Sequence, residues 1–166
     1  MAIMNVNPTR MQLSKLKKQL VTAVRGHKML KDKRDELMRQ FLDLVKETRE
    51  LRDKVERELN ECNSHFVNAS AVMSKQALDA SLMSPKQQIN IEISAKNVMS
   101  VEIPQFDTSN RTNDEGDIFP YGFAFTSFEL DDAIMSFNDV LPDMINLAQY
   151  EKSCELMSAE IEKTRG

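Results

Sequence analysis

The sequence LSKLKKQLVTAVRGHKMLKDKRDELMRQFLDLVKETRELRDKV, residues 13–55, places apolar side chains at alternating steps of three and four residues. Ten of the 13 positions reached by these steps are apolar, and the exceptions are His27, Arg34 and Thr48. A repeat sustained over about six heptads predicts a long α-helix with one apolar seam, as in a coiled coil. Such a seam needs a second helix to cover it.

The distribution of proline and glycine extends the predicted helix in both directions. Between Pro8 and Pro85 there is no proline, and Gly26 is the only glycine. Asn7 is a good N-cap residue, and Pro8 suits the first helical position because its missing N–H is not needed there. We therefore expect a helix that runs to about residue 80, roughly 110 Å at about 1.5 Å per residue. After Leu51 the apolar steps become four and four, a stutter that locally unwinds the supercoil.

The middle of the chain changes period. Apolar and polar residues alternate in residues 89–93 and again in residues 99–103, with the polar residues 94–97 between them. This pattern predicts a short β-hairpin that ends at Pro104. The aromatic-rich residues 118–125 are expected to pack under the hairpin.

A second helical seam follows this head. Its predicted start is Thr126, where Glu129 lies three residues on and completes a capping box. Pro142 is expected to end or kink this helix, after which coiled-coil spacing returns as far as Thr164. The predicted fold is mainly α: a long antiparallel two-helix coiled coil with a small β-hairpin-containing head.

This pattern divides the chain into three parts. They are a long N-terminal coiled-coil helix (residues 1–84), a β-hairpin and loop head (residues 85–125), and an incomplete returning helix (residues 126–166).

The two helices are unequal in length. If Met73 faces Leu130, the returning helix ends opposite about residue 40, and the seam from Leu13 to Leu37 has no partner within the chain. Each uncovered leucine would forfeit roughly 1.5–3 kcal/mol. Either another protein covers this seam, or the sequence is cut short at its C-terminal end.

Charge is distributed unevenly along the chain. Residues 1–35 hold nine basic and two acidic residues, a net charge of +7, whereas residues 61–166 hold seven basic and 17 acidic residues, a net charge of −10. Such a division suggests different partners at the two ends. The candidate partner-binding residues form a basic tip: Arg10, Lys15, Lys17, Lys18, Arg25 and Lys28. The alternative is an ordinary solvated helix face, since exposed ion pairs contribute only ~0–1 kcal/mol.

Few residues offer reactive chemistry. Cys62 and His65 have a spacing that can supply two metal ligands, but no second pair completes a tetrahedral site. His27 lacks an acid–base partner, and there is no phosphate-binding loop of the GxxxxGK[ST] type. We expect no catalytic residue, no cofactor and no metal. The two cysteines, Cys62 and Cys154, lie far apart and form no disulfide framework, so we expect a reducing, cytoplasmic compartment. No apolar stretch approaches the roughly 20 residues of a membrane span, so we expect no direct membrane insertion.

Five stretches resemble the D subunit of the bacterial V/A-type rotary ATPases. NPTR (residues 7–10), LKK (residues 16–18) and RGHKMLKDKRDEL (residues 25–37) resemble the N-terminal signature of that family. EKSCELM (residues 151–157) and EIEKTR (residues 160–165) resemble its returning helix. The order of residues 25–37 is not one that a generic coiled coil requires. Because the family's returning helix continues for several more heptads, the resemblance predicts that this chain is truncated at its C-terminus.

The resemblance implies a central rotor shaft that mechanically couples ATP hydrolysis or synthesis in a catalytic ring to H⁺ or Na⁺ transport. The implied shaft protein is itself non-catalytic and peripheral to the membrane. Its implied partners are the A and B subunits of the ring, the F subunit of the stalk beside the hairpin, and the rotor-connecting C (or d) subunit, with no nucleic acid. Periodicity and charge alone leave two alternatives open: a generic coiled-coil adaptor, and a basic coiled coil that binds nucleic acid through its phosphates.

Overall fold

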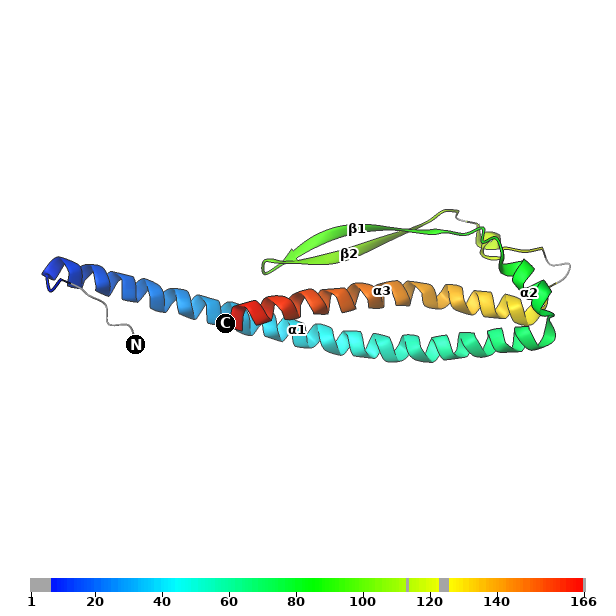
Figure 1. Cartoon of the computed structure of the whole chain (residues 1–166), viewed down its shortest axis with the longest axis horizontal. Helices are drawn as coiled ribbons and strands as arrows, with labels where there is room; N and C mark the ends of the chain where they lie inside the picture. Colours follow the sequence, from blue (N-terminus) through cyan, green and yellow to red (C-terminus); the bar gives the residue numbers. More distant parts are fainter. Residues whose placement is uncertain (1–6, 113, 123–125, 166) are drawn as a thin grey trace.

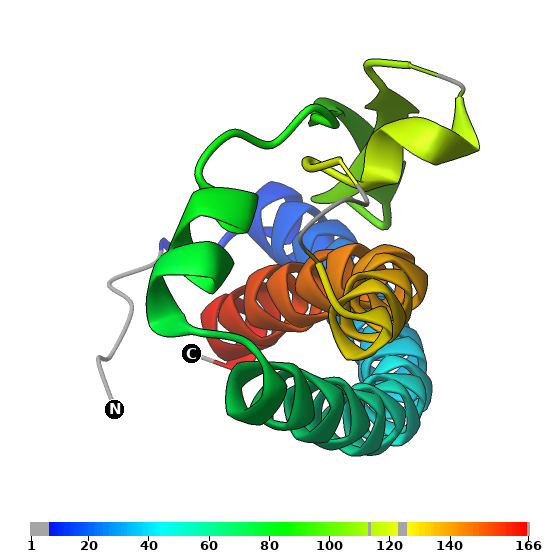
Figure 2. The same ribbon diagram turned by 90° about the vertical axis from the view of Figure 1, so that its right-hand side faces the viewer.

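The structure, a computed structural model, describes residues 7–112, 114–122 and 126–165 and consists of two long helices with a β-hairpin beside them (Figure 1). Helix α1 (Arg10–Val72) has 63 residues, about 95 Å at about 1.5 Å per residue. Helix α3 (Phe128–Arg165) has 38 residues and returns antiparallel to α1. The end-on view shows the two helices twisting about each other (Figure 2). The predicted mainly α architecture with an antiparallel helix pair and a β-hairpin is confirmed.

Helix α1 begins slightly later than its sequence suggests. Thr9 has an extended backbone, and its side chain accepts a hydrogen bond from the Gln12 N–H at 3.3 Å. Thr9 is therefore the N-cap, in place of the predicted Asn7, and Pro8 lies outside the helix.

Helix α1 also ends earlier than residue 80. Met73 is extended, and the Ser74 hydroxyl accepts a hydrogen bond from the Ala77 N–H at 3.3 Å, so it caps a second, short helix. That helix is α2 (Lys75–Leu82). A serine side chain that satisfies the first free N–H groups of a new helix competes with continuation of the old one.

The core lies between α1 and α3 as three separate apolar clusters in series. The buried members are, from the head outward, Ala69, Leu78 and Leu130; then Val55, Cys62 and Val140; and finally Leu37, Val101, Met157 and Ile161. Cys62 and Ala69, which follow the predicted stutter, are 1% and 0% exposed. The seam predicted on both sides of the stutter therefore faces the returning helix.

The hairpin consists of β1 (Ile89–Val98) and β2 (Val101–Asn110), which pair antiparallel over their whole length. The prediction that residues 94–97 connect the strands was wrong, because these residues pair along β1. Pro104 does not end the hairpin either, since it lies inside β2 opposite Ala95. In Figure 1 the hairpin runs beside α3, with its turn toward the C-terminal end of that helix.

Met99 and Ser100 form the tight turn of the hairpin. Their φ angles are 53° and 75°, and turns with positive φ at both central positions usually carry Asn-Gly. The Asn97 side chain supports the turn by accepting a hydrogen bond from the Ser100 N–H at 3.1 Å. Met99 packs against the cluster around Leu37, which offsets the strain of this backbone.

Helix α3 begins at Phe128 rather than at Thr126, and the backbone carbonyl of Ser127 accepts the first hydrogen bonds. The helix continues through Pro142, so of the two outcomes expected there, an end or a kink, the end is wrong. Pro142 cannot bond the carbonyl of Asn138, but both residues line a solvent-open hollow of about 570 Å³ beside the hairpin.

The aromatic-rich stretch after the hairpin contributes to two sites. Ile118 lines the hollow beside the open end of the hairpin. Tyr121 packs instead on the cluster nearest the head, and its O–H donates a hydrogen bond to Asp131 Oδ1 at 2.7 Å. Residues 123–125 of this stretch lie outside the described residues.

Candidate functional site: the exposed end of α1

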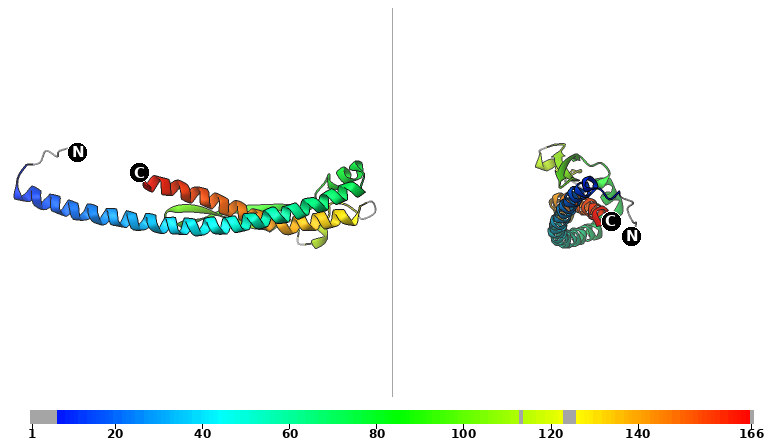
Figure 3. Two further views of the ribbon diagram at one scale, coloured as in Figure 1. Left: turned by 90° about the horizontal axis from the view of Figure 1, so that it is seen from below. Right: turned by 90° about the vertical axis from the view of Figure 1, so that its left-hand side faces the viewer.

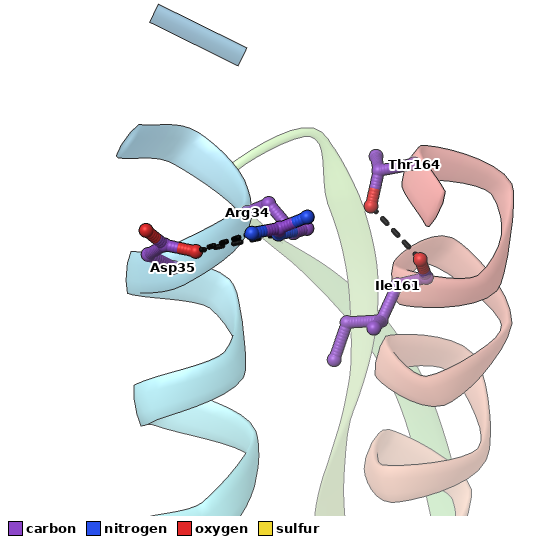
Figure 4. Close-up of polar contacts among 4 residues, drawn as sticks. All are labelled: Arg34, Asp35, Ile161 and Thr164. Atoms are coloured by element: carbon purple, nitrogen blue, oxygen red, sulfur yellow. Dashed lines mark hydrogen bonds and ion pairs between the residues drawn. The ribbon is translucent and has the colours of Figure 1, made fainter. Parts of the chain in front are cut away.

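Helix α1 extends well beyond the last turn of α3 (Figures 1 and 3). In the close-up, α3 ends with Ile161 and Thr164 alongside Arg34 and Asp35 of α1 (Figure 4). Each helix satisfies its own polar groups there: Arg34 donates to Asp35 Oδ1 at 3.0 Å, and Thr164 donates to the Ile161 carbonyl at 2.9 Å. Leu37, predicted to be bare, is 0% exposed, so the uncovered seam ends one turn earlier than expected.

The uncovered part of α1, which we call the free end (residues 10–33), is about 36 Å long at about 1.5 Å per residue. Its large apolar side chains that are at least half exposed are Met11, Leu13, Leu20, Val21, Val24, Met29 and Leu30. Leu30 is 65% exposed, whereas Leu37, one heptad further on, is fully buried. At about 100° per residue, Leu13, Leu20, Val24 and Leu30 fall on the seam side of the helix, whereas Met11, Val21 and Met29 fall on other sides. An uncovered apolar seam of this kind is typical of a protein interaction site.

All six residues of the predicted basic tip lie on the free end, and all six are exposed. At about 100° per residue, five of them fall within an arc of about 100° on the side away from the apolar seam, and Lys15 lies outside that arc. Within the described residues, none of the six forms a salt bridge. The structure therefore arranges five of the six as a stripe along the helix, not as a compact site.

Two ion pairs that sequence reasoning missed join α1 to α3. Lys54 Nζ lies 2.5 Å from Asp143 Oδ2, and Arg52 pairs with Glu151. The hydrogen bond to Asp143 raises the pKa of Lys54, and the hydrogen bond to Glu151 raises the pKa of Arg52. The partners are 89 and 99 residues apart in the chain, so no local pattern could reveal them. Both pairs oppose sliding of one helix along the other.

The two residues with metal-ligand spacing line one polar hollow of about 230 Å³. Cys62 is buried, which raises the pKa of its thiol, whereas His65 is exposed. Across the described residues, no group of three or more His, Cys, Asp or Glu side chains is placed to hold a metal ion. No helix in the described part of the chain combines the length and apolar character that crossing a bilayer requires.

These features define the class of protein: a coiled-coil shaft of two antiparallel helices, with a β-hairpin on its side and one helix exposed beyond the pair. Comparison with known proteins identifies the family. The family of ATP synthase D subunits matches residues 12–166. The chain belongs to this ATP synthase D-subunit family, the stalk subunits of V-type rotary ATPases. The resemblance seen in the sequence is confirmed.

Three relatives show the extent of the similarity. The V-type ATP synthase D subunit of Acetivibrio thermocellus is 58% identical over 165 residues, which cover 99% of this chain and 74% of the relative. The protein of the same name from Clostridioides difficile is 50% identical over 165 residues, again 99% and 74%. That from Clostridium botulinum is 53% identical over 163 residues, 98% of this chain and 76% of the relative.

Proposed function

We propose that this chain is the central rotor shaft of a V/A-type rotary ATPase, coupling ATP hydrolysis or synthesis in a catalytic ring to H⁺ or Na⁺ transport. The observation that supports this most directly is the shape of the α1–α3 pair. Its three apolar clusters and the Lys54–Asp143 and Arg52–Glu151 pairs resist relative movement of the helices. A rod of this kind can transmit rotation along its length.

The free end is the proposed contact with the A and B subunits of the ring. Its apolar seam offers surface to bury, and its basic stripe offers charge to acidic or carbonyl-rich surfaces. Exposed charges interact over several ångströms without one fixed partner geometry, so they suit a bearing against which a shaft must turn. The six residues proposed for this role are Arg10, Lys15, Lys17, Lys18, Arg25 and Lys28.

The remaining partners follow from membership of the family. In this proposal the F subunit of the stalk lies beside the hairpin, and the rotor-connecting C (or d) subunit links the shaft to the membrane rotor. The chain is non-catalytic and works on the cytoplasmic side, peripheral to the membrane. Its parts are the outgoing shaft (residues 1–84), the head (residues 85–125) and the returning shaft (residues 126–166).

Reconstitution with a ring of A and B subunits tests the proposal. The wild-type chain should bind the ring, and a bead attached to its head should rotate when ATP is added. Rotation is the readout that separates a shaft from a passive adaptor. If the chain does not bind the ring, or if bound chain does not rotate during ATP turnover, the shaft assignment is wrong.

A charge variant tests the basic stripe separately. Replacing Lys17, Lys18 and Arg25 by Gln should weaken ring binding on the order of tenfold at low salt, and the difference should shrink at high salt. A matched control replaces three exposed basic residues of the head and α2, Lys75, Lys86 and Arg111, by Gln. Equal effects of the two triple variants would show that only net charge matters and would remove the proposed role of the stripe.

A further inference from the structure

The two edges of the hairpin have different surroundings. The outer edge of β2 faces α3, where the Phe106 N–H donates a hydrogen bond to Gln149 Oε1 at 2.8 Å. In an antiparallel ladder, residues that bond across to the partner strand alternate with residues whose N–H and C=O point outward. Phe106 therefore faces outward on β2, and so does its partner Ile93 on β1. The bond from the Arg111 N–H to the Gln88 carbonyl, 2.9 Å, fits the same alternation.

The outer edge of β1 consists of every second residue from Ile93 in both directions. These residues are Ile89, Ile91, Ile93, Ala95 and Asn97. Within the described residues the sheet has only the strands β1 and β2, so no third strand bonds to this edge. Ile91 is 47% exposed and Ile93 is 71% exposed. Unpaired backbone groups and exposed apolar side chains thus lie together along one strand.

Only one of the two edges is protected against pairing with another strand. On β2, Pro104 stands at an outward position and has no N–H to donate, and Gln149 occupies the N–H of Phe106. On β1 there is no proline, and the register with β2 contains no bulge. Folded proteins usually protect long apolar edges by such devices, because an open edge pairs readily with other strands. The open edge of β1 therefore has the properties of a strand-binding site.

We propose that the F subunit of the stalk contributes an extended segment that joins the hairpin as a third strand on the outer edge of β1. This inference rests on the proposed function. The partner has to turn with the shaft, because a ladder of backbone hydrogen bonds fixes one register and cannot slide along a stationary ring. The segment is expected to place apolar residues opposite Ile91 and Ile93. On its other face it should carry a basic residue opposite Glu92 and an acidic residue opposite Lys96.

Hydrogen exchange of the wild-type chain gives a residue-by-residue test, with the purified F subunit as the probe. The amides of the five outward residues should exchange rapidly in the free chain and become protected when the F subunit is added. The amides of residues 90, 92, 94 and 96 bond across the hairpin and should be protected in both states. Protection that appears at every second residue is the signature of an added strand.

A pair of variants at Ile93 separates the backbone from the side chain. Ile93→Pro removes an outward N–H but no hydrogen bond of the hairpin, and should weaken binding of the F subunit at least tenfold. Ile93→Ala, the matched control, loses the side chain but keeps the N–H, and should weaken binding much less. Retained protection at residues 90, 92, 94 and 96 would show that the proline variant still forms the hairpin.

A result that contradicts the strand proposal can be distinguished from one that contradicts the shaft assignment. If the F subunit binds the wild-type chain while the outward amides of β1 stay unprotected, the strand proposal is wrong and the shaft assignment stands. If the alternating protection appears without the F subunit and grows with chain concentration, the edge pairs with a second copy, which also overturns the proposal. If the F subunit does not bind at all, the strand proposal fails together with the placement of that partner beside the hairpin.

Discussion

The side chain of Leu37 touches all the elements that meet at the end of α3. It packs with Val101 of the hairpin and with Met157 and Ile161 of α3, and it is 0% exposed. Replacing it by Ala should lower the free energy of unfolding by about 2–5 kcal/mol, because the cavity lies between three packed elements. Urea unfolding followed by circular dichroism measures this change.

Leu30 supplies the matched control, since it occupies the same heptad position seven residues earlier but is 65% exposed. Leu30→Ala should change the stability of the isolated chain by no more than about 0.5 kcal/mol. Similar losses in the two variants would mean that the free end is covered in solution.

Tyr121 gives the head a stability that depends on alkaline pH. Burial raises the pKa of Tyr121 above its ordinary value of 10.0, and the hydrogen bond to Asp131 acts in the same direction. The folded chain thus keeps the phenolic proton after the unfolded chain has lost it, so stability falls as the pH rises above 10.

Tyr121→Phe should remove this part of the pH dependence and cost about 1 kcal/mol at pH 7 through the lost hydrogen bond. Urea unfolding at pH 7 and at pH 11 measures both effects. The raised pKa of Lys54 affects both proteins alike, so the difference between them reports Tyr121. Parallel stability profiles for the two proteins would show that the phenol does not titrate differently on folding.

At the scale of secondary-structure elements, the backbone of the hairpin turn is strained, and the packing of the Met99 side chain compensates for that strain. Ser100→Gly should raise the free energy of unfolding by about 0.5–1 kcal/mol, because glycine accepts a φ of 75° without steric cost. Met99→Gly relieves similar strain but removes the side chain that packs near Leu37, so it should lower stability. Thermal unfolding of both variants distinguishes backbone strain from packing; a stabilised Met99→Gly would contradict the anchoring role of Met99.

The sequence predicted the elements that depend on local residue patterns. It misplaced those that depend on contacts between residues far apart in the chain. The heptad repeat is local, so both helices and their antiparallel pairing could be predicted. The turn at Met99 and Ser100 could not, because its backbone is stabilised by packing of Met99 against the Leu37 cluster, whose members include residues far away in the chain. The end of α1 was missed for a different reason. The apolar period continues past Val72, whereas Met73 is extended and the Ser74 hydroxyl caps the new helix α2.

The candidate site was likewise predictable only in the features that local sequence patterns determine. Charge counts along the chain located the basic residues of the free end, and the unequal lengths of the two helices indicated that part of the seam is uncovered. The pairs of Lys54 with Asp143 and of Arg52 with Glu151 depend on the register of the two helices, which periodicity does not fix to a single residue. The open edge of β1 required the true turn position, because a shift of one residue exchanges inward and outward groups.

The whole molecule should show a gradient of stability along α1. The free end keeps its helical hydrogen bonds without burial against α3, so it opens locally at lower cost than the paired region. Hydrogen exchange followed by mass spectrometry should find faster exchange in residues 14–33 than in residues 40–70. Addition of a ring of A and B subunits should slow exchange in the free end. Uniform protection along α1 of the isolated chain would contradict this picture.

The serial arrangement of the three clusters also sets an order for folding. Between α1 and α3 members of the same cluster, the intervening chain is shortest near the head, 61 residues from Ala69 to Leu130, and lengthens to 85 from Val55 to Val140. It reaches 124 residues from Leu37 to Ile161. Because closing a longer loop costs more entropy, the helices should zip together from the head, and the Leu37 cluster should close last.

Kinetic φ-values test this order. Substitutions in the cluster nearest the head, such as Ile134→Val, should slow folding, whereas Ile161→Val should mainly accelerate unfolding. If instead Ile161→Val slowed folding and Ile134→Val mainly accelerated unfolding, the folding nucleus would lie at the Leu37 cluster. If the helices pair in the expected order, they also separate first at the end where α3 stops. The contacts of the hairpin tip with that end are then the last to form during folding and the first to break during unfolding.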